Sequence, residues 1–189
     1  SILDAAAALF AKSGYPSAKM EDVAKACGAT KSMLYHYFPA KDDLLFAMLK
    51  DHLDNVIAVI EDALDVKSTP KQRLSLFIKS YTQKSAQSRR RHIIAMNDVK
   101  YLPKTMQTPL LQREVEVTNT LSQLLKEVNP GLPEEVYKPY SMLLIGMLNW
   151  TDTWFRPSGT MKADELCERA SRLFLRGFLA EKPAKSSAA

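Results

Sequence analysis

The stretch from Ser17 to Leu44 constrains the fold of this 189-residue chain more than any other part. Met20 and Val23 fall on one face at helical spacing, which predicts a first short helix. Gly28 follows where a helix end needs a left-handed backbone, which glycine adopts without steric cost. Thr30 is then a good N-cap, because its hydroxyl accepts a bond from a backbone N–H. The sequence therefore predicts two short helices joined by a tight turn.

The second of these helices, residues 31–38, has one apolar side and one polar side. Leu34 and Phe38 lie four residues apart and form the inner side, and Pro39 ends the helix. A helix, a glycine turn and a polar-faced helix together are typical of the helix-turn-helix, whose second helix enters the major groove of DNA. An ordinary polar helix surface is the alternative interpretation. The register of the whole stretch favours DNA binding by the polar side, which carries Thr30, Lys31, Ser32, Tyr35 and Tyr37.

Helical apolar spacing continues through almost the whole chain, without a strand pattern or an internal repeat. We predict an all-α fold of about nine helices in three parts. These are a three-helix helix-turn-helix domain (residues 1–46), a larger helical domain for ligand binding and dimerisation (residues 47–181) and a flexible tail (residues 182–189). No run approaches the ~20 apolar residues that a membrane span needs, and the first residues resemble an amphipathic helix, not a signal peptide. We therefore expect a cytoplasmic protein with no membrane partner.

One predicted helix is long enough to connect the two domains. It begins after Pro39 and runs from residue 41 to about residue 65, which is roughly 37 Å at 1.5 Å per residue. Arg89, Arg90 and Arg91 are predicted to form a basic corner between two later helices. Further helices are expected over residues 70–88, 93–102, 109–125, 133–155 and 166–178.

The net charge of +5 is unevenly distributed along the chain. Residues 1–50 carry six lysines and five acidic residues, so the candidate DNA-binding part is nearly neutral. Residues 67–104 carry ten basic residues and one aspartate. Because one copy of the first part has few basic groups, its affinity for DNA must come from a few placed contacts and from dimerisation.

The order of these residues resembles the TetR family of transcriptional regulators. The resemblance is carried by Gly14-Tyr15, by residues 21–24 and 28–38, and by Lys41 followed by Leu44-Leu45. It covers about the first quarter of the chain, and beyond it only the number and order of the helices agree. The family implies a homodimer, formed through the last two long helices, that binds double-stranded operator DNA. It also implies a repressor that a small effector releases.

Family positions that touch DNA correspond here to Thr30, Lys31, Ser32, Tyr35, Tyr37 and Lys41, and Lys19 before the first short helix is predicted to add a phosphate contact. Their hydroxyl, phenol and ammonium groups suit phosphate oxygens and base edges. The sequence departs from the family pattern at three places. Ala18 and Lys19 replace a frequent Thr or Ser and leave the first short helix with a poor N-cap, Ser32 replaces a frequent Gly, and Tyr37 replaces a frequent His.

The second domain is expected to hold the effector. A segment with Trp150, Trp154, Phe155 and Arg156 is similar to one in TetR-type regulators that sense acyl-CoA thioesters. Core packing and a dimer interface are the plainer interpretation of these aromatic residues, and a flat hydrophobic drug or an aromatic acid is the competing effector class. The basic corner has two interpretations. It is either a solvated surface or the entrance to a pocket, where its charge attracts an anionic ligand. The predicted ligand-binding residues are Phe77, Tyr81, Met96, Tyr101, Trp150, Trp154 and Arg156.

An enzyme has little support in the sequence. The three histidines are isolated, and no metal-ligand, nucleophile-elbow or phosphate-loop pattern occurs. We therefore predict no catalytic residue, no metal and no cofactor. Cys27 and Cys167 are expected to be buried free thiols. A helical acyl-group carrier without DNA binding is the second candidate function, but it would not need the residues from Thr30 to Lys41.

Overall fold

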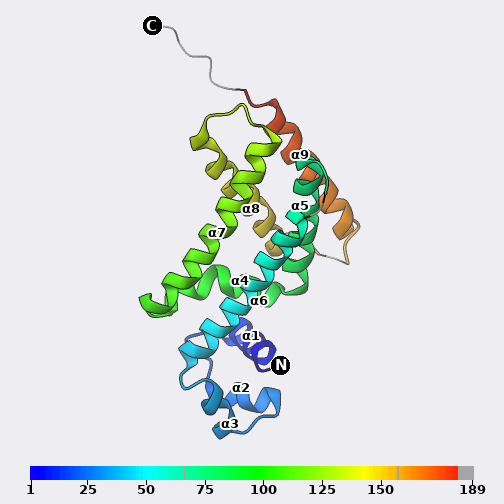
Figure 1. Cartoon of the computed structure of the whole chain (residues 1–189). Coiled ribbons are helices and arrows are strands. Elements are labelled where there is room, and N and C mark those ends of the chain that lie inside the picture. The colour runs from blue at the N-terminus through cyan, green and yellow to red at the C-terminus, as the bar shows by residue number, and fades with distance from the viewer. Residues whose placement is uncertain (66, 157, 183–189) are drawn as a thin grey trace. The chain divides into compact units, whose positions relative to one another are not determined.

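The computed structural model describes residues 1–65, 67–156 and 158–182, with all side chains except those of Met96 and Asp152. Within these residues the chain forms nine α-helices and one short 3-10 helix, and no strand (Figure 1). The all-α fold expected from the helical spacing is confirmed. No helix in the same residues is long and apolar enough to cross a membrane. Of the predicted flexible tail, only Lys182 lies within the described residues.

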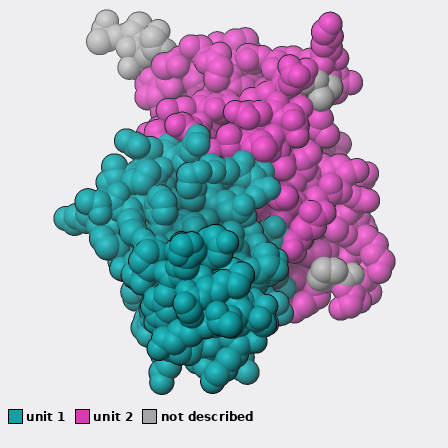
Figure 2. Space-filling model, turned by 60° about the horizontal axis from the view of Figure 1, so that its bottom comes forward, with its two compact units in different colours: residues 1–55, 88–114 teal, residues 56–87, 115–189 magenta. Residues whose placement is uncertain are grey.

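The helices group into two compact units, which Figure 2 shows in different colours. Unit 1 comprises residues 1–55 and 88–114, and unit 2 comprises residues 56–87 and 115–189. The unit that holds the helix-turn-helix thus also takes in a later segment of the chain. The boundary expected at residue 46 differs from this grouping and stays a prediction.

Unit 1 contains helices from two separate parts of the chain: α1 (Ile2–Ser13), α2 (Met20–Cys27), α3 (Lys31–Tyr37), the first part of α4 (Lys41–Asp65), α6 (Arg89–Asp98), the 3-10 helix η1 (Val99–Tyr101) and the first part of α7 (Lys104–Val128). Unit 2 contains the remaining parts of α4 and α7 together with α5 (Pro70–Gln87), α8 (Glu134–Trp154) and α9 (Ala163–Ala180). The helices α4 and α7 therefore contribute to both units. The bounds of α4 agree with the long helix expected from the sequence.

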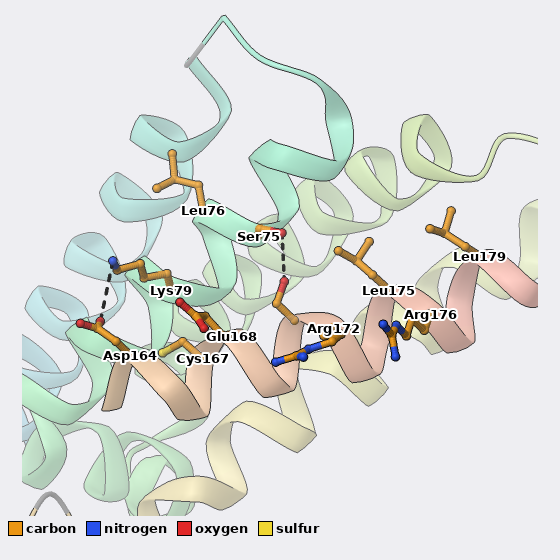
Figure 3. Close-up of a pocket in the computed structure, with 11 residues that line it drawn as sticks. Ser75, Leu76, Lys79, Asp164, Cys167, Glu168, Arg172, Leu175, Arg176 and Leu179 are labelled. Carbon is orange, nitrogen blue, oxygen red and sulfur yellow. Dashed lines mark hydrogen bonds and ion pairs between the residues drawn. The ribbon is translucent and has the colours of Figure 1, made fainter. Parts of the chain in front are cut away.

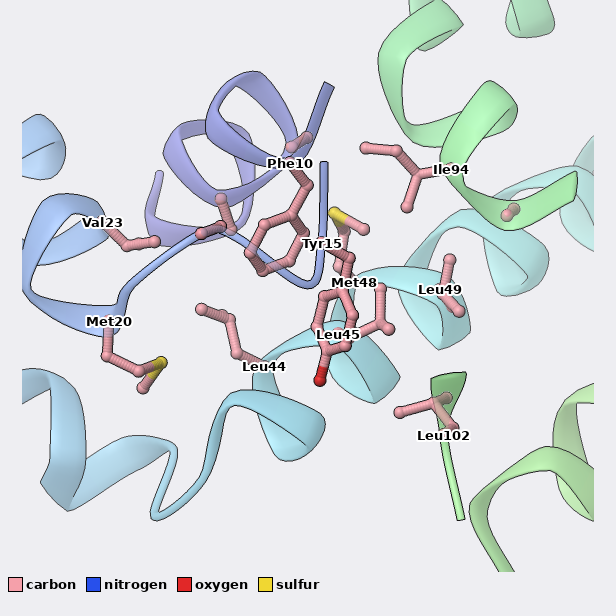
Figure 4. Packing of buried hydrophobic residues seen from close by; sticks show 14 of the residues in the cluster. Phe10, Tyr15, Met20, Val23, Leu44, Leu45, Met48, Leu49, Ile94 and Leu102 are labelled. Carbon is pink, nitrogen blue, oxygen red and sulfur yellow. The ribbon is translucent and has the colours of Figure 1, made fainter. Parts of the chain in front are cut away.

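The core of unit 1 draws side chains from both of its chain segments (Figure 4). Leu34, Leu44 and Met48 are fully buried within it. Ile94 of α6 and Leu102 pack in the same cluster, which explains why residues 88–114 belong to this unit. Each fully buried leucine contributes about 2 kcal/mol of hydrophobic free energy. The helix-turn-helix is therefore held by a core to which α6 also contributes.

The core of unit 2 is formed by the facing sides of its helices. Phe77 of α5 and Leu144 of α8 are almost completely buried, as is Phe178 of α9. Polar side chains also tie this unit together. The Tyr81 hydroxyl donates to Asn149 Oδ1 at 2.6 Å, and the Asn129 side-chain amide donates to the Phe178 carbonyl at 2.9 Å.

The structure corrects two expectations about helix starts. The helix expected from residue 93 begins four residues earlier, at Arg89, so the three arginines form the first turn of α6, directly after α5 ends at Gln87. The helix expected from Pro109 begins five residues earlier, at Lys104, so that Pro109 lies inside it. The Met106 and Gln107 N–H groups donate to the Pro103 carbonyl at 2.9 and 3.0 Å and fix this earlier start. Pro109 has no N–H, so α7 lacks one backbone hydrogen bond at this position.

Candidate nucleic-acid interface

The second helix of the helix-turn-helix, α3, separates its two sides as expected. Leu34 is fully buried and Phe38 is half-buried against the unit 1 core. The polar residues of the opposite side are all exposed, and Tyr37 exposes 62% of its surface. The side of α3 that faces solvent is therefore polar. It is made up of the N-cap residue Thr30 and of Lys31, Ser32, Tyr35 and Tyr37 within the helix.

The turn between α2 and α3 is a Schellman motif. Gly28 has φ 69° and ψ 20°, which is the left-handed conformation predicted for it. Its N–H donates to the Lys25 carbonyl at 3.3 Å, and the Ala29 N–H donates to the Ala24 carbonyl at 2.9 Å. The Thr30 hydroxyl then accepts from the Met33 N–H at 3.1 Å, as its N-cap role requires. These bonds fix the direction in which α3 leaves α2.

An ion pair joins the two helices across the exposed side. Lys31 Nζ lies 2.6 Å from Glu21 Oε1 and 5.6 Å from the centroid of the Tyr35 ring. The hydrogen bond to Glu21 raises the pKa of Lys31, and the same bond lowers the pKa of Glu21. Both side chains are largely solvated. The ammonium group can therefore exchange this carboxylate for another anion at low cost.

Lys19 is the N-cap residue of α2. Its side chain makes no capping hydrogen bond, so the poor N-cap predicted from the missing Thr or Ser is confirmed. Lys19 is exposed and is predicted to contact phosphate. Its ammonium group is therefore accessible to an anion.

Lys41, which was predicted to contact DNA, lies in a different environment. Its Nζ donates to the carbonyl oxygens of Tyr15, Pro16 and Ala18 at 2.8, 3.1 and 3.1 Å. It also lies 4.5 Å from the centroid of the Tyr15 ring. An ammonium group has three N–H donors, and three carbonyls of the loop between α1 and α2 take them. The geometry therefore favours a positioning role, in which Lys41 fixes this loop on the start of α4.

Tyr15 strengthens the same junction between α1 and α4. Its hydroxyl donates to Asp42 Oδ1, and its ring contacts Phe10 edge-on at a centroid distance of 5.2 Å. The residue is 5% exposed. Burial raises the pKa of Tyr15, and the Asp42 carboxylate raises it further. The phenol therefore stays protonated and keeps its bond to Asp42.

Charged contacts tie α6 to two other helices of unit 1. Arg91 donates to Asp51 Oδ2 in α4, and it reaches Asp4 Oδ1 in α1 at 2.6 Å. The Ser1 hydroxyl lowers the pKa of Asp4, and the Arg91 guanidinium lowers it further. Only 17% of the Arg91 side chain is exposed. This residue is therefore a clamp between three helices, and not part of an open basic surface.

Two buried histidines make a further contact between α4 and α6. His52 Nε2 lies 3.0 Å from His92 Nδ1, and the two residues are 3% and 4% exposed. A hydrogen bond between these nitrogens requires one to carry a proton and the other to accept it. The sequence interpretation of isolated histidines missed this pair, because the two residues lie 40 positions apart.

The predicted ligand-binding residues occupy different environments. Phe77 and Tyr81 belong to the core of unit 2, at 1% and 5% exposure. Trp150 and Trp154 expose 66% and 51% of their surface, and Arg156 is exposed as well. Tyr101 belongs to unit 1, where its ring stacks on Tyr15 at 5.6 Å between centroids. The side chain of Met96 lies outside the described part, and a single cavity lined by all seven residues stays a prediction.

The two thiols of the described chain are unpaired. Cys167 is buried as expected, at 3% exposure. Cys27 is only half-buried, because the last turn of α2 faces solvent beside Gly28. No cluster of three or more metal-ligating side chains occurs among the described residues.

Comparison with known families identifies both parts of the chain. A model described as bacterial regulatory proteins of the tetR family matches residues 2–48. A model of the tetracyclin repressor-like C-terminal domain matches residues 67–178, more than half of the chain. The chain belongs to the TetR family. Its α2 and α3 are thus the DNA-binding helices of a TetR-family transcriptional regulator, and members of this family are regulators, not enzymes.

Solved structures of TetR-family proteins share the whole fold. A TetR-family transcriptional regulator from Bordetella parapertussis is 33% identical, with a TM-score of 0.86 over 95% of each chain. AibR, solved in complex with isovaleryl coenzyme A and operator DNA, is 24% identical. Its TM-score is 0.81, over 91% of this chain and 95% of that chain. At this sequence identity, the similarity to AibR shows a shared fold alone.

Curated relatives in the TetR family match to different extents. The chain is 23% identical over 187 residues to the HTH-type transcriptional repressor KstR2 of Mycobacterium tuberculosis, covering 95% of this chain and 92% of the relative. It is 32% identical over 80 residues to the HTH-type transcriptional activator FasR of Mycolicibacterium smegmatis. That match covers 42% of this chain and only 36% of the length of FasR.

Proposed function

We propose that this TetR-family regulator is a repressor that binds a palindromic operator as a homodimer and is released by a hydrophobic or acyl-CoA effector. The exposed polar face of α3 is the observation that carries the proposal. Its hydroxyl, phenol and ammonium groups point away from the buried Leu34. A helix of this size fits the major groove, which is about 12 Å wide.

The contacts we propose divide into two kinds. Lys31 reaches a base edge or a phosphate once it leaves Glu21. Tyr35, Tyr37 and the hydroxyl groups of α3 donate to phosphate oxygens, which set the register on DNA without reading sequence. Lys19 adds a phosphate contact. Lys41 holds the loop and α4 in place, and it acts on DNA through that geometry.

The homodimer is supported by apolar surface that remains uncovered on α8 and α9. Met142, Leu143 and Trp150 of α8 are 61–66% exposed, and Leu173 of α9 is 70% exposed. Gly146 lies among the exposed α8 residues, and an added Cβ there would meet no atom within 4 Å. Exposed apolar patches of this kind are typical of protein interfaces. A two-fold interface would place two α3 helices about one turn of DNA apart.

Release follows from linkage between effector and DNA. The two α3 helices of a dimer can lie at a spacing that fits DNA or at one that does not. An effector that binds the second form of the dimer more tightly shifts the population toward it. A hundredfold change in occupancy needs a difference of roughly 2.7 kcal/mol. The helix α4 begins at Lys41, beside α3, and continues to Asp65, so a shift in its direction would move the recognition helix.

An acyl-CoA thioester is the effector class we favour. The AibR structure, which shares the fold, contains such a thioester, isovaleryl coenzyme A. The aromatic segment at Trp150 and Trp154 and the basic excess in residues 67–104 also support it. Arg91 is paired with two carboxylates, so it is not available to bind the phosphates of coenzyme A. A flat hydrophobic drug or an aromatic acid is the competing class.

Selection of bound fragments from genomic DNA, followed by fluorescence anisotropy, tests operator binding. A Tyr35→Ala, Tyr37→Ala variant should lose at least about tenfold in affinity while keeping its helix content. Lys162→Ala, an exposed residue of unit 2, is the control and should bind as the wild type does. A protein that selects no DNA, yet binds acyl groups, would be the carrier that forms the alternative function.

The effector is tested on the protein–operator complex found in that selection. Isovaleryl and octanoyl coenzyme A should release the DNA, whereas coenzyme A alone should not. Naphthoate represents the competing aromatic class. Release by naphthoate without release by either thioester would overturn the acyl-CoA assignment and leave operator binding intact.

A further inference from the structure

A groove between α5 and α9 of unit 2 has no part in the DNA interface. Its volume is about 800 Å³, which lies within the roughly 300–1,000 Å³ typical of small-molecule sites. Figure 3 shows that its walls come from one face of α5 and one face of α9. We propose that this groove binds an anionic amphiphile, with its aliphatic chain on the leucines and its carboxylate or phosphate on two arginines.

The apolar part of the groove is formed by three leucines. Leu76 comes from α5, and Leu175 and Leu179 come from successive turns of α9 (Figure 3). Leu76 and Leu175 also pack against the unit 2 core, which fixes their positions, and Leu179 is 38% exposed. An alkyl chain that covers them removes apolar surface from water, which favours binding.

Arg172 and Arg176 supply the anion-binding part. They lie one turn apart on α9, and both side chains are exposed at the groove. Neither has an ion-pair partner among the residues that the structure describes. Their neighbour Arg169, in contrast, is paired with Glu165 at 2.8 Å. Two unpaired guanidinium groups at this spacing suit the planar or branched oxygens of a carboxylate or a phosphate.

Four other polar side chains of the groove already have partners. Lys79 lies 3.7 Å from Asp164, and Ser75 and Ser171 share a hydrogen bond of 2.9 Å. Burial raises the pKa of the Cys167 thiol, so it stays protonated and takes no part in charge recognition. Glu168 is the remaining acid, one turn before Arg172 and two turns before Arg176 along α9. After the Lys79–Asp164 pair cancels, the two arginines and Glu168 leave the groove with one net positive charge.

A second copy of the chain does not fit the groove as well as an amphiphile does. The most exposed leucine of α9 is Leu173, two residues from Leu175. At about 100° per residue, these two side chains point to nearly opposite sides of the helix. A subunit interface built on Leu173 therefore leaves Leu175 and Leu179 uncovered, with Arg176 at its edge. The two unpaired arginines also favour an anion over an apolar protein surface.

Isothermal titration of the full chain with decanoate and with decyl phosphate, below their micelle concentrations, tests the proposal. Both should bind, and the tighter of the two identifies the head group. Decanol, which has the same chain without the charge, should bind at least about tenfold more weakly. An Arg172→Gln, Arg176→Gln variant should lose about tenfold or more for the anions. Arg169→Gln, on the same helix but outside the groove, is the matched control and should bind them as the wild type does.

A Leu179→Glu variant tests the apolar part and should weaken decanoate more than acetate. Circular dichroism checks that each variant folds. If the double arginine variant does not fold, Arg172→Gln and Arg176→Gln are tested singly. Each single variant should lose about threefold or more in affinity for the anions. Equal binding by the double variant, equal binding of decanol, or no binding to the wild type would overturn the proposal. A Leu179→Glu chain that sediments as a smaller species than the wild type would also overturn it, because the groove would then be a subunit interface. None of these measurements involves DNA, so their failure leaves operator binding untouched.

Discussion

Lys31 is held by Glu21 in the structure, and DNA must compete with that carboxylate. Glu21→Gln should raise operator affinity by about threefold at low salt, because it frees the ammonium group and removes a negative charge near the phosphates. Lys31→Ala should lower the affinity. If Lys31 binds phosphate, the slope of log K against log salt should also fall by about 1 per subunit. Anisotropy titrations at several salt concentrations measure both changes, and a Glu21→Gln variant that binds more weakly would contradict this arrangement.

Lys41 is the residue whose role the structure changes most. Lys41→Met keeps the aliphatic stem but removes the donors to three carbonyls, and we expect it to lower the free energy of unfolding by about 2 kcal/mol. Lys25→Met, at an exposed position of α2, is the control and should have little effect. Thermal unfolding followed by circular dichroism distinguishes the two roles. A Lys41→Met protein with an unchanged Tm and a lost DNA affinity would restore the direct contact.

Tyr15 predicts a dependence of stability on alkaline pH. Its pKa is raised in the folded state by burial, and next by Asp42, so the unfolded chain loses this proton first as the pH rises. The stabilisation is therefore complete below pH 10 and declines above it, by up to about 1.4 kcal/mol per pH unit. Urea unfolding between pH 8 and 11 should show a smaller decline for Tyr15→Phe than for the wild type. The exposed Tyr37→Phe is the control, and equal declines in wild type and Tyr15→Phe would refute the argument.

At the residue scale, roles that depend on neighbours in the sequence were predictable. Contacts between residues far apart in the sequence were not. The predicted roles of Gly28 at a helix end and of Thr30 as an N-cap are confirmed, because both depend only on the immediate neighbours of these residues. The carbonyls that surround Lys41 come from residues 23–26 positions earlier, and His52 meets His92 from 40 positions away. No short pattern in the sequence specifies such contacts.

At the element scale, Arg91 of α6 makes the charged contacts that join this helix to both α1 and α4. Arg91→Met should release these ties and cost about 1–2 kcal/mol, since Arg91 is largely buried but Asp4 and Asp51 are partly solvated. We expect faster hydrogen exchange in the amides of α6 than in those of α3. Arg90→Met, at the adjacent exposed position, is the control. Unchanged exchange in α6 would mean that its apolar contacts alone hold it in place.

The bounds of a helix were predictable where a single start signal precedes it. They were less predictable where two prolines, Pro103 and Pro109, offer alternative starts. The bounds of α4 agree because Pro39 precedes it and an apolar stripe runs through it. Between residues 89 and 109 the chain offers several starts, and tertiary packing selects among them. Ile94 and Leu102 are buried in the unit 1 core, and both α6 and α7 begin earlier than the local pattern predicts.

At the scale of the whole molecule, we propose that the exposed apolar faces of α8 and α9 pair with a second copy of the chain, and a substitution at Gly146 tests this pairing without disturbing the monomer. An added Cβ at Gly146 meets no atom within 4 Å in one chain, and alanine or leucine is a better helix former than glycine. Gly146→Leu should therefore leave or raise Tm in a monomer, whereas in a close two-fold interface it would separate the subunits.

We expect this variant to sediment as a monomer at micromolar concentration and to lose about a hundredfold or more in operator affinity, because one α3 replaces two linked ones. Gly131→Ala, where an added Cβ also meets nothing, is the control and should stay dimeric. Since residues 1–50 carry only one net positive charge, a single copy has little electrostatic hold on DNA. A monomeric variant that keeps full affinity would mean that the polar face of α3 binds DNA without a second copy, and the proposed role of the α8 and α9 faces would fail.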